Sequence, residues 1–428
     1  MIGQKMKTVI YVLLLAYTET SCKEDQVKPS ITNNIYKPIP SSLDTIWGKN
    51  LDDGNDGAFS INPILNSNNE ILMSDWGNSR GSEIFKLYDG STGKLKWQWS
   101  DFIRPEQIFN DEHHLVINDA LILCSHNATY ALNIVTGQTL WKHYSDTMYG
   151  EPFIFKDDDG YIYHSFKGEN GNATCYFFRT KYDKLNWELI CEYADSINYK
   201  DMSCSAIALS VNSKGEKLMI FSAYLVSPQN ITMSRICCYN ISLKKYEWKK
   251  DYTNSYAEFS VSKILQANNK IFTFVMQGSY GILTAVNTID GSISWQQQLP
   301  EYGKQMFLYK DNIIVLSDEG GDIESSYALC FNQNTGTKIW NIKLDKTYGS
   351  INFNGGDANI FKNYLFSTQC GNLIVLNLDY GTVIFNKQVA LPEGCLQAGV
   401  AINEQKRWLY VQDRYRVVCY KLPEEVKY

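Results

Sequence analysis

Cys330-Phe331-Asn332-Gln333-Asn334-Thr335-Gly336, followed by Thr337-Lys338-Ile339-Trp340, is the stretch that decides the fold of this chain. An Asp or Asn lies eight residues before an aromatic residue, and a Gly lies four before it. The Asp or Asn side chain opens a type I turn by accepting backbone hydrogen bonds, and Gly takes the left-handed position that follows. Such a turn joins two antiparallel strands through a glycine bulge. Each copy of this phrase therefore predicts a β-hairpin.

The aromatic residue recurs eight times, with gaps of 50, 44, 46, 61, 47, 45 and 45 residues. A near-constant spacing of this size indicates a repeat architecture. Four short strands with their turns use about 45 residues. We therefore expect an all-β fold, an eight-bladed β-propeller of four-stranded antiparallel blades. The aromatic residues, expected as a structural ladder of wedges between blades, are Trp47, Trp97, Trp141, Trp187, Trp248, Trp295, Trp340 and Phe385.

The two ends of the repeat region predict how the ring closes. Trp47 lies in a lone strand with no turn phrase before it, and the chain ends soon after the strand residues 417–420 without another aromatic outer strand. The N-terminal strand is expected to close the last blade, which leaves no free sheet edge. Residues 43–428 then form one domain. The long gap before Trp248 predicts enlarged connections near residues 193–205 and 226–233.

The first residues differ in composition from the rest. Lys5 and Lys7 precede the apolar run 9–17, which is too short to cross a bilayer and is typical of a secretory leader. Residues 1–21 are therefore predicted to be a signal peptide. Thr20-Ser21-Cys22 resembles the lipobox of bacterial lipoproteins, although Glu19 stands where a leucine is usual.

A lipid anchor on Cys22 follows from that resemblance, with residues 22–42 as a flexible, proline-containing tether. The expected location is the outer membrane of a Gram-negative bacterium, with the lipid as the only membrane contact. Lys23-Glu24-Asp25 resembles a surface-export signal, but an ordinary polar tether explains it equally well. The periplasmic side and the cell surface both remain open.

Several cysteines fit the repeat register as core residues. Cys238 and Cys330 lie ten residues before their tryptophans, in a slot that holds small or apolar residues in other repeats. Cys175 and Cys419 are expected in the same slot. Cys237 and Cys238 fall within one extended strand, where adjacent side chains point to opposite faces, so a vicinal disulfide is not expected.

Charge and motifs exclude several functions. The formal charge of −6 is spread along the chain without a basic stripe, so nucleic acid is not an expected partner. No Cys-x-x-Cys pair or histidine cluster indicates a metal site, and no catalytic residues are predicted. Residues 157–160, Asp-Asp-Asp-Gly, could start a calcium loop, but the rest of that ligand pattern is missing and an acidic hairpin turn is favoured.

The repeated phrase Ala/Cys-x-Asp/Asn-x-x-Thr-Gly-x-x-x-Trp resembles the repeat of PQQ-like (pyrroloquinoline-quinone-type) β-propellers, over at least residues 43–422. The resemblance implies two alternatives. One is a quinoprotein dehydrogenase that holds PQQ and calcium. The other is a non-catalytic lipoprotein of the BamB type, which acts as a protein-binding scaffold. Fold alone does not choose between them.

A scaffold is the preferred hypothesis, because the chain carries little beyond its repeats and has a lipobox-like leader. No cofactor is then expected, and the expected partners are envelope proteins, an outer-membrane barrel among them. A glycan- or ligand-binding surface module is the second hypothesis, and a PQQ- and calcium-dependent oxidoreductase is the third. Tyr and Arg are enriched where proteins meet. The candidate binding face comprises Trp76, Asn78, Arg80, Tyr149, Tyr224, Gln277, Tyr280, Arg414 and Tyr415.

Overall fold

A computed structural model of the chain describes most of the repeat region. Residues 38–428 form one compact unit, and residues 1–37 form a second unit that lies outside the description. The predicted leader and Cys22 are therefore outside it. Within the described part, no helix is long and apolar enough to cross a membrane. The described residues are 43–50, 61–76, 83–103, 114–124, 128–144, 148–149, 154–168, 174–195, 197–252, 264–277, 280–300, 302–318, 326–344, 358–369, 372–389, 399–413 and 416–428.

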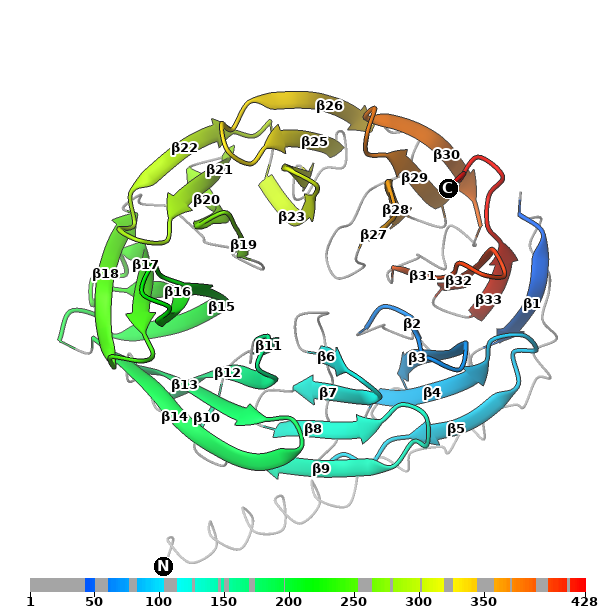
Figure 1. Ribbon diagram of the computed structural model, residues 1–428, viewed down its shortest axis with the longest axis horizontal. Coiled ribbons are helices and arrows are strands. Elements are labelled where there is room, and N and C mark those ends of the chain that lie inside the picture. Colours follow the sequence, from blue (N-terminus) through cyan, green and yellow to red (C-terminus); the bar gives the residue numbers. More distant parts are fainter. Residues whose placement is uncertain are drawn as a thin grey trace, which may run out of the picture. The chain divides into compact units, whose positions relative to one another are not determined.

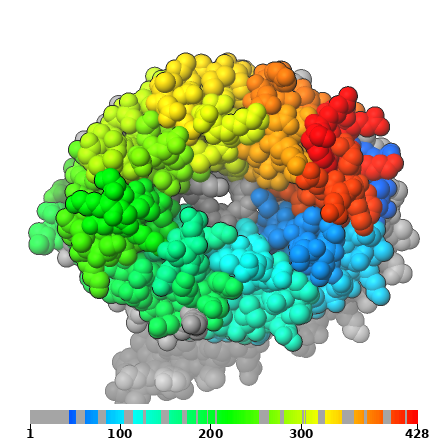
Figure 2. Space-filling model, viewed as in Figure 1, coloured from blue at the N-terminus to red at the C-terminus, as the bar shows by residue number. Residues whose placement is uncertain are grey.

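The unit that follows residue 37 is an eight-bladed β-propeller of antiparallel sheets, as the repeat predicts (Figure 1). Seven blades are built from consecutive strands, and neighbouring blades pack side by side in chain order around the ring (Figure 2). Blade 3 has its first strand divided into β10 and β11, both paired with β12.

Blades 1 to 4 have the following strands: β2–β5 (Ile64–Leu65, Glu70–Trp76, Glu83–Asp89, Leu95–Trp99); β6–β9 (His114–Ile117, Ala120–Cys124, Ala128–Asn133, Thr139–Tyr144); β10–β14 (Met148–Tyr149, Ile154–Lys156, Tyr161–Gly168, Thr174–Lys181, Lys184–Ala194); and β15–β18 (Asp201–Val211, Lys217–Val226, Thr232–Asn240, Lys245–Tyr252). Blades 5 to 7 have β19–β22 (Leu265–Ala267, Lys270–Gln277, Tyr280–Asn287, Ile293–Gln298); β23–β26 (Tyr302–Tyr309, Asn312–Asp318, Ser326–Asn332, Lys338–Leu344); and β27–β30 (Asn359–Phe361, Tyr364–Gln369, Asn372–Asn377, Thr382–Gln388).

Blade 8 joins the two ends of the propeller. It contains β31 (Val400–Asn403), β32 (Trp408–Gln412), β33 (Arg416–Lys421) and, as its outer strand, β1 (Thr45–Asn50). Trp47 of β1 pairs with Cys419 of β33 in antiparallel register. The predicted closure of the last blade by the N-terminal strand is confirmed, and Figure 1 shows the two ends of the sequence sharing this sheet.

The turn phrase forms the hairpin that the sequence predicts. In blade 6, the Asn332 side-chain oxygen accepts the backbone N–H groups of Asn334 and Thr335 at 3.0 and 3.1 Å. Gly336 has a φ of 71° and donates its N–H to the Asn332 carbonyl at 2.9 Å. The strand register then shifts by one residue beside Cys330, as a bulge requires. In blade 6 this turn thus sets the register of the outer strand against the third strand.

The cysteine predictions are confirmed in part. Cys238, Cys330 and Cys419 are fully buried and pair across the sheet with Trp248, Trp340 and Trp47. Cys237 and Cys238 face opposite sides of their blade, because they belong to different core clusters. The placement of Cys175 in the same slot is wrong: it is buried but pairs with Tyr193, a register set by the two-residue turn of blade 3.

The long gap before Trp248 has a different cause from the one expected. Most of the extra residues lengthen strands, because β14 and β15 have eleven residues each and β16 has ten. The connections themselves are short, at residues 195–200 and 227–231. Backbone bonds tie them together, since Lys200 donates its N–H to the Val226 carbonyl at 2.9 Å. The extra residues of blade 4 therefore lie mainly in long paired strands, where the backbone N–H and C=O groups are hydrogen-bonded.

Candidate binding face and the interfaces that position it

Most interfaces between neighbouring blades share one hydrogen bond, which the indole of a ladder tryptophan donates to a turn of the next blade; we call these the regular interfaces. In blade 4, the Nε1–H of Trp248 donates at 3.0 Å to the carbonyl of Thr288, which lies in the turn of blade 5. The bond satisfies the indole donor in a buried place and fixes the position of one blade on the next. Equivalent bonds join Trp47 to Gly90 (2.9 Å), Trp97 to Val135 (3.1 Å), Trp141 to Tyr182 (2.8 Å), Trp295 to Gln333 (3.1 Å) and Trp340 to Leu378 (3.2 Å).

The turn glycine completes the same contact. Gly291 has a φ of 69°, and a Cβ placed on it would lie 2.6 Å from the Trp248 ring. Both the left-handed backbone and the close approach of the indole therefore require glycine at this position. The same approach, with the nearest ring atom at 2.5 to 2.7 Å from such a Cβ, occurs at Gly93, Gly137, Gly336 and Gly381.

The interface between blades 3 and 4 departs from this pattern. Trp187 does not pair with the slot residue of its blade, because Phe178 pairs with Leu189 instead. The Trp187 ring packs in the preceding interface and stacks on His164, with centroids 5.5 Å apart. Its Nε1 is buried without a hydrogen-bond partner among the described residues. Lys244, at the position of the turn glycine in blade 4, has a φ of 54°.

The sequence carries a signal for this departure. Asp183 stands four residues before Trp187, where five of the other phrases have Gly, and Arg179 stands eight before it, where the other phrases have Asp or Asn. Because blade 3 lacks the turn phrase, its third and fourth strands are joined by a different turn, and the turn sets the register of the outer strand. The ladder spacing alone therefore misplaces Trp187.

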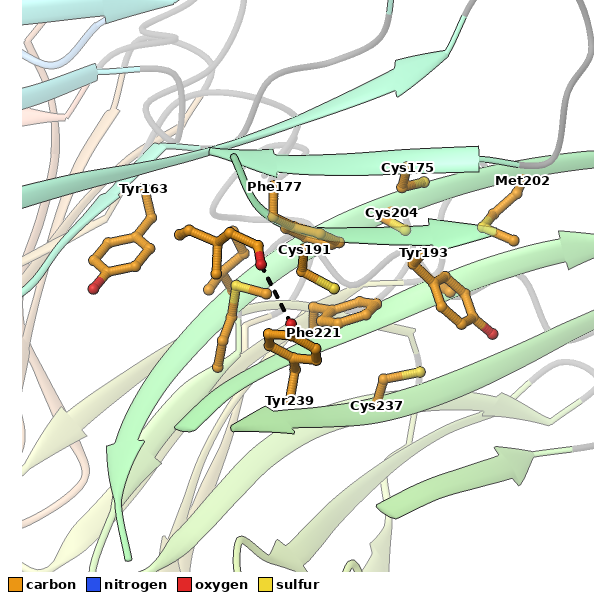
Figure 3. Packing of buried hydrophobic residues seen from close by; sticks show 14 of the residues in the cluster. Tyr163, Cys175, Phe177, Cys191, Tyr193, Met202, Cys204, Phe221, Cys237 and Tyr239 are labelled. Atoms are coloured by element: carbon orange, nitrogen blue, oxygen red, sulfur yellow. Dashed lines mark hydrogen bonds between the residues drawn. The ribbon is translucent and has the colours of Figure 1, made fainter. Parts of the chain in front are cut away.

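Tyrosines and thiols pack in the blade 3–blade 4 interface (Figure 3), and ion pairs join the two blades as well. The Tyr239 hydroxyl donates to the Ile190 carbonyl at 3.3 Å, and the Tyr246 hydroxyl lies 3.1 Å from the Cys191 sulfur. Burial raises the pKa of Cys191 to about 11, so the thiol stays protonated at neutral pH. The interface is thus well packed, but without the indole hydrogen bond.

The Asp-Asp-Asp-Gly stretch takes part in this interface. Asp157 is almost buried, and its Oδ2 lies 2.6 Å from Nζ of Lys217 in blade 4, with which it forms an ion pair. Burial opposes ionisation of Asp157, but the bonds from Lys217, the Tyr161 N–H and the Tyr163 hydroxyl outweigh it and lower the pKa of this carboxyl. The stretch is a hairpin turn, since the Asp157 N–H donates to the Tyr161 carbonyl. The ion-pair partner of Asp157 is Lys217 of the protein itself, which fits a structural role for this turn.

The interface between blades 7 and 8 uses tyrosine as well. Phe385 is buried in the position of the ladder tryptophan and has no donor to offer. The Tyr420 hydroxyl donates instead to the Val389 carbonyl at 2.7 Å. The Tyr364 hydroxyl donates to the Lys427 carbonyl at 2.8 Å and fastens the chain end to blade 7. An aromatic side chain with a polar tip therefore replaces the indole at both irregular interfaces.

The described candidates lie at the other end of the blades from the turn phrases, because strand direction alternates. Trp76, Tyr224, Gln277 and Tyr280 lie next to second-to-third-strand connections. Tyr149 pairs with Lys167 near the end of the second strand of blade 3. Tyr224 is half-buried on β16, opposite Ser203 and Ser234. Four other candidates are placed in strands, without a description of their side chains: Trp76 in β3, Tyr149 in β10, Gln277 in β20 and Tyr280 in β21. The remaining candidates, Asn78, Arg80, Arg414 and Tyr415, lie outside the described residues.

No group of three or more His, Cys, Asp or Glu side chains within the described ranges could hold a metal ion.

Comparison with known proteins agrees with the repeat. Residues 245–424 match the family model described as outer membrane protein assembly factor BamB. The outer membrane protein assembly factor BamB of Shewanella oneidensis is 22% identical over 156 residues, which cover 34% of this chain and 38% of that protein. The match thus spans well under half of either chain.

Solved structures show the same fold at low identity. Quinohemoprotein alcohol dehydrogenase ADHIIG of Pseudomonas putida HK5 aligns with a TM-score of 0.55 and 12% identity, over 92% of this chain and 79% of that one. Sqt1 of Chaetomium thermophilum aligns with a TM-score of 0.57 and 11% identity, over 90% and 100%. With the blade count, the turn phrase and the family-model match taken together, the chain is an eight-bladed β-propeller with a PQQ-like repeat, and it resembles the outer membrane protein assembly factor BamB.

Proposed function

We propose that this protein is a non-catalytic scaffold of the cell envelope, which binds other envelope proteins through the face of the propeller opposite the turn phrases. The match of residues 245–424 to the assembly-factor model carries the proposal. The lipobox-like leader ending at Cys22 supports an anchor in the outer membrane. An outer-membrane barrel is the first candidate among the partners.

The choice of face rests on how the two faces are used. On the turn face, the phrases are engaged in contacts between blades, through their carbonyls and glycines. On the opposite face, the connection between β16 and β17 at residues 227–231 contains exposed Gln229, Asn230 and Ile231. Tyr224 lies close to this connection. Side chains that do not serve the ring are available to a partner.

Site-specific photocrosslinking in the native host tests both the function and the face. A photoreactive amino acid replaces Tyr224 in one strain and Ile289 in another, since Ile289 is an exposed residue of the blade 5 turn. Crosslinks to an envelope protein from position 224, and none from position 289, are the expected result. Crosslinks from 289 alone would move the binding surface to the turn face.

Two further outcomes would replace the scaffold itself. Oxidation of an alcohol or sugar by purified protein supplied with PQQ and calcium would establish a quinoprotein. Retention on a glycan array that is lost in Trp76→Ala would establish a carbohydrate-binding module. Both assays use the mature chain that serves for the crosslinking.

A further inference from the structure

Thiols gather at the blade 3–blade 4 interface. Cys175, Cys191, Cys204 and Cys237 all belong to one buried cluster, together with Phe177, Tyr193 and Phe221 in the core of that interface (Figure 3). Each of the other four described cysteines is the single cysteine of its cluster: Cys124, Cys238, Cys330 and Cys419. Of the two interfaces without an indole hydrogen bond, the one between blades 3 and 4 is therefore also rich in cysteine.

Two of these thiols face each other from different blades. Cys175 lies on β13 of blade 3, and Cys204 lies on β15 of blade 4. The two strands contact each other, and the Cys175 and Cys204 side chains lie next to each other in the shared cluster (Figure 3). The other two thiols have tyrosine partners: Cys191 lies by Tyr246, and Cys237 by Tyr193. The geometry thus singles out one pair.

We propose that Cys175 and Cys204 form a disulfide that joins blade 3 to blade 4 in the exported protein. The proposal rests on the export that the leader predicts, because disulfides persist in oxidising compartments. The bond would close a loop of about 30 residues and restrict the unfolded chain. It would also link two blades that lack the indole contact of the regular interfaces.

The reaction is a dithiol–disulfide exchange with a disulfide oxidant, such as oxidised glutathione or a thiol oxidase of the envelope. The thiolate of one cysteine, written here for Cys204, attacks one sulfur of the oxidant, forms a mixed disulfide with it and displaces a thiolate. The Cys175 thiolate then attacks the Cys204 sulfur and displaces the second oxidant thiolate. The two protons of the cysteines end on the oxidant, which is reduced by two electrons.

The thiols are accessible to this exchange before the interface closes. Burial raises the pKa of Cys204 well above its usual range, and the adjacent Cys175 thiol raises it further. A thiol held protonated in the folded core is a poor nucleophile. Oxidation during folding is therefore favoured over oxidation of the finished propeller.

Refolding of the mature chain in a glutathione redox buffer tests the proposal without reference to partners or location. Free thiols are alkylated, the protein is digested without reductant, and peptides are identified by mass spectrometry. The peptide linking Cys175 to Cys204 is expected to exceed any other linked peptide of the described cysteines by about tenfold, because the native fold holds these two thiols together.

Denaturation with and without reductant gives the second readout. The oxidised wild type is expected to unfold at lower denaturant once a reductant is present, and Cys204→Ser to show no such dependence. Cys204→Ala serves if the serine variant does not fold. Cys330→Ser is the control, because Cys330 is also buried, and this variant is expected to keep the reductant dependence.

Alkylation of both Cys175 and Cys204 in correctly folded, oxidised protein would overturn the proposal. So would a linkage of either cysteine to a different partner in a chain of full stability. Such a result leaves the scaffold untouched, since the crosslinking experiment does not depend on the disulfide. Failure of the crosslinking likewise leaves the disulfide intact.

Discussion

The interface between blades 4 and 5 and the one between blades 3 and 4 solve the same packing problem in different ways. In the first, Trp248 lies on Gly291 and donates to the Thr288 carbonyl, so one side chain supplies both apolar area and a directional bond. In the second, Trp187 lies elsewhere, and tyrosines, thiols and ion pairs fill the space. The comparison indicates that the turn glycine depends on the tryptophan of the preceding blade. Trp187 of blade 3 does not lie in the blade 3–blade 4 interface, and the turn of blade 4 has Lys244 in place of glycine.

Lys244 shows this dependence most directly. It occupies the turn position that Gly291 holds in the next blade, also with a positive φ. A side chain fits at Lys244 because no ladder tryptophan of blade 3 lies over it. The glycine of the phrase is therefore required chiefly by the neighbouring blade, and only in part by its own turn.

The largest expected effect comes from removing the wedge itself. Trp248→Ala should lower the free energy of unfolding by about 3–5 kcal/mol, since a large buried side chain is lost and the Thr288 carbonyl loses its donor. Trp187→Ala should cost about 1–3 kcal/mol, because the indole N–H lost there has no hydrogen-bond partner. Guanidinium unfolding followed by circular dichroism measures both. Equal losses would contradict the distinction between the two interfaces.

A smaller effect is expected at the turn. Gly291→Ala should destabilise by about 1–3 kcal/mol, because a Cβ would meet the Trp248 ring and the left-handed backbone disfavours alanine. Lys244→Gly should change stability by no more than about 0.5 kcal/mol, since relief of the left-handed strain is offset by a more flexible unfolded chain. Thermal unfolding of the two variants and the wild type measures both changes in stability. A cost at Lys244 as large as that at Gly291 would show that the turn alone requires the residue.

The smallest expected effect concerns the ion pair of the blade 3–blade 4 interface. Lys217→Met should cost about 1–2 kcal/mol at pH 7, because Asp157 is left nearly buried without its cation. The folded-state pKa of Asp157 is lowered, so its ion pair stabilises above the usual aspartate pKa and is lost as the pH falls through the folded value. The difference between variant and wild type should therefore shrink below about pH 4.

Lys310→Met is the control for that experiment. Its partner Asp379 is a third exposed and Lys310 is 63% exposed, so the solvent screens the pair. A much smaller loss of stability than that of Lys217→Met is therefore expected. A stability difference for Lys217→Met that persists unchanged at pH 3 would show that packing of the lysine stem, and not its charge, is what matters.

Much of the fold follows from the sequence, because the phrase before each tryptophan specifies a local turn. Asn332 and Gly336 act within five residues, so their effect can be read without knowing the rest of the chain. The closure of blade 8 follows as well, since an unpaired first strand and an incomplete last blade need each other. The candidate binding face is different: Tyr224 can be placed, whereas its role depends on a partner that no spacing encodes.

By itself, the sequence determined the number of blades, the turn chemistry and the burial of Cys238, Cys330 and Cys419, because these depend on period and local hydrogen bonding. Only the tertiary structure decided where Trp187 lies, which blade requires each glycine, and that Cys175 and Cys204 meet. Those outcomes depend on contacts between residues of different blades, and the register of one strand fixes them. Residue spacing describes positions along the chain, whereas a contact between blades joins residues that are far apart in the sequence.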